Sequence, residues 1–208
     1  MIGTRANRFY AYYKETAADR AIVLIAEDQL SFLQWDTGFI SLLALERRMA
    51  GRDCLILHCA YIRYQQEALL FSAPSETGKS TQANLWEKYR GSETVNGDRA
   101  LLTKADGHWV AQGWPICGSS EICENISAPI RAIVTLSQEK ENRASVIHPA
   151  EAFMSIYPQI TVNSWDRECI TNSLNLTEAL LKEVPVYHLG CTISEEAVNC
   201  LNEILYPD

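Results

Sequence analysis

The sequence predicts an α/β fold in which a mixed β-sheet is flanked by helices. Apolar runs of strand length recur along the 208 residues, and stretches with the spacing of amphipathic helices separate them. Residues 67–90 combine an apolar run, a loop of small residues and a helical stretch. Asp106-Gly107 lies between two apolar segments, and this dipeptide favours a tight hairpin turn. Strands interleaved with helices, together with one hairpin, indicate a sheet with both parallel and antiparallel pairs.

The N-terminal quarter has a weaker pattern than the rest. Residues 1–20 are polar and aromatic without clear periodicity, so no element is assigned there. Residues 21–26 and 30–35 are predicted strands, and 39–49 is a predicted helix that Gly51 can end. We treat residues 1–50 as an N-terminal extension or small subdomain and residues 51–208 as the main domain.

The main domain alternates between strands and helices. Leu176 and Leu180 lie one turn apart on a Leu-rich helix, and Ser194 offers an N-cap for the last helix. The predicted strands are 54–58, 60–64, 68–71, 93–96, 100–103, 108–112, 130–136 and 185–189; the predicted helices are 82–90, 149–157, 173–182 and the stretch after 194.

Composition and charge argue against several classes of function. The net charge of −8 and the sequence pI near 5.1 argue against non-specific binding to nucleic acid or to anionic membranes. The N-terminus lacks the apolar core of a signal peptide, and the longest apolar runs are too short to span a bilayer. The seven cysteines are odd in number and form no C-x-x-C pair, which favours reduced thiols and a cytoplasmic protein.

Residues 67–81, EALLFSAPSETGKST, have the strand–loop–helix context of a phosphate-binding P-loop. Backbone N–H groups of the loop and the helix N-terminus would face an anion. Lys79 would reach the outer phosphates and the Ser80 hydroxyl would bind Mg²⁺. The motif has Ala73 where the usual pattern has glycine, which is tolerated only at negative φ. The alternative is an ordinary strand–turn–helix. The predicted nucleotide-binding residues are Ala73, Pro74, Ser75, Glu76, Thr77, Gly78, Lys79, Ser80 and Thr81.

Two further residues are candidates for chemistry beside this loop. Asp98 follows a predicted strand, where its carboxylate would hold Mg²⁺ or accept a proton from an incoming hydroxyl. The alternative is a turn aspartate that caps a loop. His58 lies on the strand before the loop strand, and a histidine among apolar residues is more often a packed core residue than a catalytic one.

Four segments together resemble the HPr kinase/phosphorylase-like family, which is related to the PEP carboxykinase type of P-loop fold. The segments are LILHCAYIRYQQEALLFSAPSETGKSTQANLW, VNGDRALL, GWPICGSSEIC and APIRAIVTL, and the resemblance covers about residues 54–208. It implies a P-loop kinase-like domain that uses ATP, or another phosphoryl donor, with Mg²⁺ to phosphorylate a serine hydroxyl. It also implies that Lys79, Ser80 and Thr81 contact nucleotide and metal, that Asp98 is the metal-linked acid or base, and that His58 is an active-site histidine.

The chain departs from that family at informative positions. Family members carry two adjacent acidic residues where this chain has Gly97-Asp98. Their distinctive N-terminal domain is not evident, so HPr is a doubtful acceptor. Shorter relatives that act on peptides or small molecules are more similar. The resemblance also implies that homo-oligomers occur.

Several other residues are candidate contacts for the phosphate or the acceptor. Gly118, Ser119 and Ser120 belong to the GWPICGSS loop, for which the alternative is a structural turn. Arg99 and Arg131 carry guanidinium groups that suit phosphate oxygens, and either is equally a surface arginine.

The sequence therefore predicts an ATP-dependent phosphotransferase whose acceptor hydroxyl lies on a peptide, protein or small molecule. The alternative is a nucleotide-binding regulatory or adaptor module with weak catalysis, favoured by Ala73 and by the single acidic residue at Gly97-Asp98. A PEP carboxykinase-like or hydrolytic enzyme is disfavoured by chain length.

Overall fold

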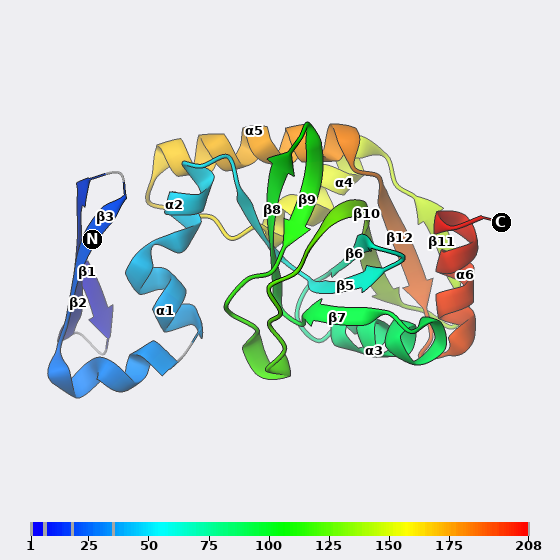
Figure 1. Cartoon of the computed structure of the whole chain (residues 1–208), viewed down its shortest axis with the longest axis horizontal. Helices are drawn as coiled ribbons and strands as arrows, with labels where there is room; N and C mark the ends of the chain where they lie inside the picture. The colour runs from blue at the N-terminus through cyan, green and yellow to red at the C-terminus, as the bar shows by residue number, and fades with distance from the viewer. Residues whose placement is uncertain (1, 6–7, 18, 35, 208) are drawn as a thin grey trace.

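A mixed sheet of nine strands forms the centre of the molecule (Figure 1). The computed structural model describes residues 2–5, 8–17, 19–34 and 36–207. The strands are β4 (Leu55–His58), β5 (Ala60–Tyr64), β6 (Glu67–Ser72), β7 (Glu93–Asn96), β8 (Arg99–Ala105), β9 (His108–Gln112), β10 (Ser127–Gln138), β11 (Arg143–Val146) and β12 (Val186–Cys191). Their order is β4-β8-β9-β10-β6-β5-β7, with β12 paired to β10 and β11 to β12. The predicted mixed α/β fold is confirmed.

Strand β10 joins the two parts of this sheet. Its first residues, from Ser127 to Pro129, pair antiparallel with β9, and its later residues pair parallel with both β6 and β12. The register with β6 places Thr135 opposite Ser72, the last residue of β6. The carboxyl ends of these parallel strands therefore lie at one edge of the sheet, where ligands bind in open α/β folds.

Helices cover both faces of the parallel strands. α3 (Lys79–Arg90) and α6 (Glu195–Leu205) cover one face, and α4 (Pro149–Ile156) and α5 (Arg167–Glu183) cover the other (Figure 1). Side chains alternate along β6, so that Leu69 and Phe71 pack with Trp86 of α3 while Leu70 packs with Leu180 of α5. The continuous apolar run of β6 is explained by this burial on both faces.

Turns and caps follow local chemistry. Asp106 (φ 51°) and Gly107 (φ 84°) form the predicted β8–β9 hairpin, because a type I′ turn needs two residues with positive φ. Gly91 ends α3 in the left-handed region (φ 64°) and donates its N–H to the Glu87 carbonyl. Asp166 caps α5 by accepting hydrogen bonds from the backbone N–H groups of Glu168 and Cys169.

The N-terminal region differs from its prediction. β1 (Ile2–Arg5), β2 (Arg8–Ala17) and β3 (Arg20–Ile25) form a separate antiparallel sheet, and β1 and β2 were not predicted. The predicted strand at 30–35 is wrong, since η1 (Glu27–Gln34) is a 3₁₀ helix and residue 35 lies outside the described residues. A short apolar run does not distinguish a strand from a helix. The predicted helix at 39–49 divides at Ala44 (φ 47°) into α1 (Asp36–Leu43) and α2 (Leu45–Ala50).

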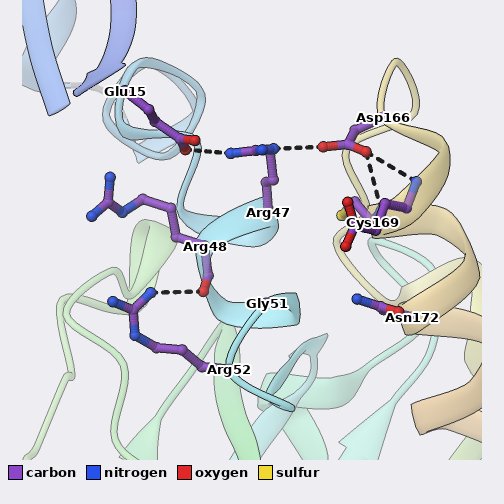
Figure 2. Close-up of a pocket in the computed structure, with 9 residues that line it drawn as sticks. Glu15, Arg47, Arg48, Gly51, Arg52, Asp166, Cys169 and Asn172 are labelled. Atoms are coloured by element: carbon purple, nitrogen blue, oxygen red, sulfur yellow. Dashed lines mark hydrogen bonds and ion pairs between the residues drawn. The ribbon is translucent and has the colours of Figure 1, made fainter. Parts of the chain in front are cut away.

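The N-terminal region is attached to the main domain by apolar packing and by charge. Ile40 of α1 shares a buried cluster with Ile56, Trp114 and Ile116. Figure 2 shows Arg47 of α2 between two carboxylates, because its guanidinium donates to Glu15 on β2 and to Asp166 at the start of α5. The predicted boundary between an N-terminal region (1–50) and a main domain (51–208) stays a prediction. In the part of the chain that the structure describes, no helix is long and apolar enough to cross a membrane.

We predict that Arg47→Gln lowers the free energy of unfolding by about 1 kcal/mol, the scale of a partly exposed ion pair. The hydrogen bond from Arg47 lowers the pKa of Asp166, so this contribution is present above about pH 4 and is lost as the pH falls through the lowered pKa. Urea unfolding at pH 7 and at pH 3 measures both effects. Arg20→Gln, on an exposed arginine, is the control. A deficit that does not shrink at pH 3 would contradict this account.

Candidate functional site

The loop between β6 and α3 contains the predicted phosphate-binding residues. Gly78 precedes α3 with φ 114°, a backbone conformation that L side chains rarely adopt. Ala73 lies outside the left-handed region, so the condition for alanine at this position is met. Its methyl group is buried with Phe71 and Ala83, which gives Ala73 a packing role. The loop can therefore adopt its turn without the first glycine of the usual motif.

Lys79 is the buried cation of this loop. Its side chain is only 7% exposed, and Nζ donates to the carbonyls of Ala73 (2.9 Å) and Pro74 (3.2 Å). Burial lowers the pKa of Lys79, while the nearby charge of Asp98 acts in the opposite direction. These two hydrogen bonds join the first residue of α3 to the beginning of the same loop.

The turn that carries Asp98 is organised by Asn96. This side chain is fully buried and uses both ends of its amide. Its oxygen accepts hydrogen bonds from the N–H groups of Asp98 (2.9 Å) and Arg99 (2.8 Å), and its nitrogen donates to the carbonyls of Trp114 (2.8 Å) and Ile116 (3.0 Å). Asn96 thus connects the β7–β8 turn to the loop after β9.

Asp98 lies between two basic side chains. Its Oδ1 is 3.4 Å from His58 Nε2, and its Oδ2 is 3.1 Å from Arg99 Nε. The Arg99 contact is an ion pair without hydrogen-bond geometry, because Nε lacks a hydrogen-bond partner among the described residues. The hydrogen bond from His58, followed by the charges of Arg99, His58 and Lys79, lowers the pKa of Asp98. Asp98 is therefore a carboxylate at neutral pH.

Both basic neighbours of Asp98 are fixed by the segment after α4. His58 Nδ1 lies 3.2 Å from Gln159 Oε1, and Arg99 donates to the Thr161 hydroxyl at 2.8 Å. The second ring nitrogen of His58 is thereby oriented toward the carboxylate of Asp98.

The GWPICGSS loop lies against this turn. A Cβ at Gly118 would lie 3.1 Å from the carboxyl carbon of Asp98, and a Cβ at Gly97 would overlap the side chain of Ser120. An acidic residue in place of Gly97 would therefore displace the 3₁₀ turn Gly118–Ser120. This close approach explains why the chain has a single carboxylate at this turn.

The structure brings most of the predicted site residues together but not all of them. His58, Lys79, Asp98, Arg99, Gly118 and Ser120 share one edge of the sheet, and Ser119 is exposed beside them. Arg131 does not join them. It follows Ile130, which pairs with Ala68 near the start of β6, and its guanidinium contacts the Leu205 carbonyl and the Tyr206 ring. This end of β6 lies opposite to the loop.

Two cavities flank the loop. One, of about 410 Å³, is lined by Ser72, Ala73 and Pro74 together with residues of β10, β12 and the α4 region, among them His188 and Gln159. The other, of about 320 Å³, is lined by residues of the loop and α3 and by the ends of β10 and β12, among them Gly78 and Glu139. Both are large enough for part of a small-molecule ligand.

The described residues would offer Mg²⁺ few protein ligands, so most of its ligands would come from phosphates and water. Among the described residues, no group of three His, Cys, Asp or Glu side chains is placed to bind a metal ion. Ser80 in the first turn of α3 and Asp98 supply one hydroxyl and one carboxylate. Mg²⁺ in nucleotide sites needs few protein ligands, because phosphates and waters complete its octahedron.

Sequence reasoning missed Asn96, Gln159, Thr161 and His188 as site residues. Asn96 had a signal, because an Asn-Gly-Asp segment after a strand is typical of a side chain that caps its own turn. Gln159, Thr161 and His188 reach the site only through the fold, since they lie far from the loop in sequence.

Comparisons with known proteins provide little beyond the fold. No family model matches the sequence, and no curated protein matches it. Among solved structures, the chain is similar to the Hpr(Ser) kinase/phosphatase from Coxiella burnetii, with a TM-score of 0.41 and 10% identity. The similarity covers 72% of this chain and 87% of that chain. It concerns the arrangement of strands and helices and not the activity.

We predict that Gly97→Ala destabilises the folded chain by about 1–3 kcal/mol, the usual cost of overpacking, because the new methyl group overlaps Ser120. Ser120→Gly removes the overlapped atoms but also removes a hydroxyl that bonds the Cys117 carbonyl. The test is a double-mutant cycle in urea. The double variant is expected to be more stable than the sum of the single effects, and strict additivity would contradict the contact.

Proposed function

We propose that this protein is an ATP-dependent phosphotransferase that moves a phosphoryl group to a hydroxyl of a peptide, protein or small molecule. The observation that carries the proposal is the position of Lys79. Its buried ammonium closes the loop before α3, and it lies close enough to Asp98 for each charge to shift the other's pKa. A cation for phosphates and a carboxylate for a hydroxyl are the two groups that phosphoryl transfer requires.

Binding of phosphates would use the loop and the start of α3. The N–H groups around Gly78 and the positive end of the α3 dipole favour an anion at this point. Lys79 would exchange its bonds to the carbonyls of Ala73 and Pro74 for bonds to phosphate oxygens. Mg²⁺ would be held by Ser80 and Asp98, and it would neutralise charge on the phosphates.

Asp98 would orient the acceptor hydroxyl and take its proton. A carboxylate with a lowered pKa is a weak base, but a loose transition state for phosphoryl transfer needs little proton removal before the bond to phosphorus forms. His58 contacts the same carboxylate, and its position is fixed by Gln159. We assign His58 the role of holding Asp98 in place and of sharing the proton.

A second candidate is a nucleotide-binding regulatory or adaptor module with weak catalysis. Two observations favour it. Lys79 is bonded back onto loop carbonyls, and both oxygens of Asp98 face basic side chains. A module of this kind would bind nucleotide without consuming it.

We predict that Mg²⁺ with ATP raises the unfolding midpoint and that Lys79→Ala abolishes the rise. At a ligand concentration of about 100 times Kd the stabilisation is about 2.7 kcal/mol. For a chain of this size that corresponds to roughly 5–10 °C. ADP, GTP and pyrophosphate, each with and without Mg²⁺, identify the preferred donor. The measurement is a thermal unfolding series followed by fluorescence.

Lys88→Ala is the matched control for that series, because Lys88 lies on the same helix with its side chain in solvent. The apo midpoint of each variant separates loss of folding from loss of binding. An equal rise in the wild type and in Lys79→Ala would refute the role of Lys79. No rise with any donor would refute nucleotide binding.

We predict that Asp98→Asn lowers ADP formation from ATP by about 10²–10⁴-fold, the usual contribution of a general base, while nucleotide affinity changes only a few-fold. Asp106→Asn is the matched control, because Asp106 lies in the next turn and asparagine tolerates its positive φ. ADP formation is measured with and without cell extract as a source of acceptor, and extract alone gives the background. Unchanged turnover in Asp98→Asn would remove Asp98 from the chemistry. Nucleotide binding without turnover in the wild type would favour the adaptor.

A further inference from the structure

Ser137, His188 and Glu139 form a cluster on the side of the loop away from Asp98. Ser137 Oγ donates to Glu139 Oε1 at 2.7 Å and lies 2.9 Å from His188 Nε2. His188 Nε2 is 3.8 Å from the same carboxylate oxygen. A serine hydroxyl thus contacts two groups that can accept its proton, which is the arrangement of an activated nucleophile.

His188 contacts a hydroxyl through each of its ring nitrogens. Thr135 donates its only hydroxyl proton to the Tyr187 carbonyl (3.2 Å). Its oxygen, 3.0 Å from His188 Nδ1, therefore accepts a hydrogen bond from that nitrogen. With the ring proton on Nδ1, the single proton of the Ser137 hydroxyl is donated either to Glu139 Oε1 or to His188 Nε2, and both acceptors lie within hydrogen-bond distance.

The sheet leaves room for this cluster. Ser137 pairs with Gly190 of β12 in the parallel register. A Cβ at Gly190 would overlap the carboxyl group of Glu139. The absence of a side chain at this position lets Glu139 fold back over β12 and reach Ser137. Ser137 itself is partly exposed.

The cluster lies beside the loop that would hold the phosphates. Thr135 is opposite Ser72 in the β6–β10 register, so Ser137 lies two residues beyond the end of β6, level with the start of the loop. His188 lines the 410 Å³ cavity with Ser72 and Pro74, and Glu139 lines the 320 Å³ cavity with Gly78. The two partners of Ser137 therefore line one cavity each, while Ser137 itself lines neither.

We propose that Ser137 is a phosphoryl acceptor within this chain, so that the protein phosphorylates itself at this hydroxyl when ATP occupies the loop. This inference rests on the proposed function. Ser137 Oγ forms a bond to the γ-phosphorus of ATP, and the bond from that phosphorus to the bridging oxygen of ADP breaks. The bonding electrons leave with ADP, and the serine proton passes to His188 Nε2 or to Glu139. The products are phosphoserine 137 and ADP.

The test incubates the purified chain with Mg·ATP and follows its intact mass, with peptide mapping of the product. The expected result is one added phosphoryl group on Ser137, absent in Ser137→Ala and in Lys79→Ala. His188→Gln is expected to slow incorporation by about 10²-fold, because it removes a base from the hydroxyl. Ser164→Ala is the control, since Ser164 is an exposed serine in the turn before α5, away from the cluster.

Parallel thermal unfolding separates this inference from the proposed function. A midpoint raised by Mg·ATP without phosphate on the wild type, or with phosphate retained in Ser137→Ala, overturns the inference and leaves the proposed function standing. No midpoint shift and no phosphate overturn both. If Ser137→Ala does not fold, Ser137→Thr keeps a hydroxyl, and the phosphate is then expected on the new threonine.

Discussion

The parallel pairing of β6 with β10 is the constraint on which the rest of this site depends. Because the two strands run in the same direction, both end at one edge of the sheet, and the loop to α3 begins there. β12 adds a third parallel strand that carries His188 to the same edge. Apolar packing on both faces fixes the register, because a slip of one residue would exchange the side chains that face α3 with those that face α5.

The charges of the site are local in a chain that is acidic overall. The net charge of −8 would repel a nucleotide at long range, so a nucleotide bound as we propose would be attracted locally by the loop, Lys79 and Arg99. Burial strengthens these interactions, because the surrounding protein screens charge less than water does. Uncharged amides hold the charged groups: Asn96 fixes the turn of Asp98, and Gln159 fixes the ring of His58. Rigid polar partners of this kind keep catalytic groups in place before substrate arrives.

Two sets of polar groups therefore flank the loop. His58 and Asp98 lie on the side of β4 and β8, and Ser137, His188 and Glu139 lie on the side of β10 and β12. Each set joins an imidazole to a carboxylate, but only the second contains a hydroxyl within hydrogen-bond distance of both. Under the two proposals above, the first set would serve an external acceptor and the second the chain itself.

The sequence alone determined the mixed α/β fold, most strands and helices after residue 51, the Asp106-Gly107 hairpin and the loop before α3. These features depend on local periodicity and on turn residues, which are visible within about ten residues. It did not determine β2, the 3₁₀ helix at Glu27–Gln34 or the break at Ala44, where short segments are ambiguous until they pack. The β5–β6 turn at Gln65-Gln66 also has positive φ at both residues, without the usual Asn-Gly signal.

The tertiary structure decided which polar residues meet. Asp98 was predicted from its place after a strand and His58 from the family resemblance, but Gln159 and Thr161 reach their neighbours from about 60–100 residues away. Arg131 was misplaced for the same reason: its strand was predicted, but only the register shows that it lies at the end opposite to the loop. Spacing along the chain determines the face of a strand on which a side chain lies. Pairing between strands determines the edge of the sheet at which it ends, and pairing is a property of the whole fold.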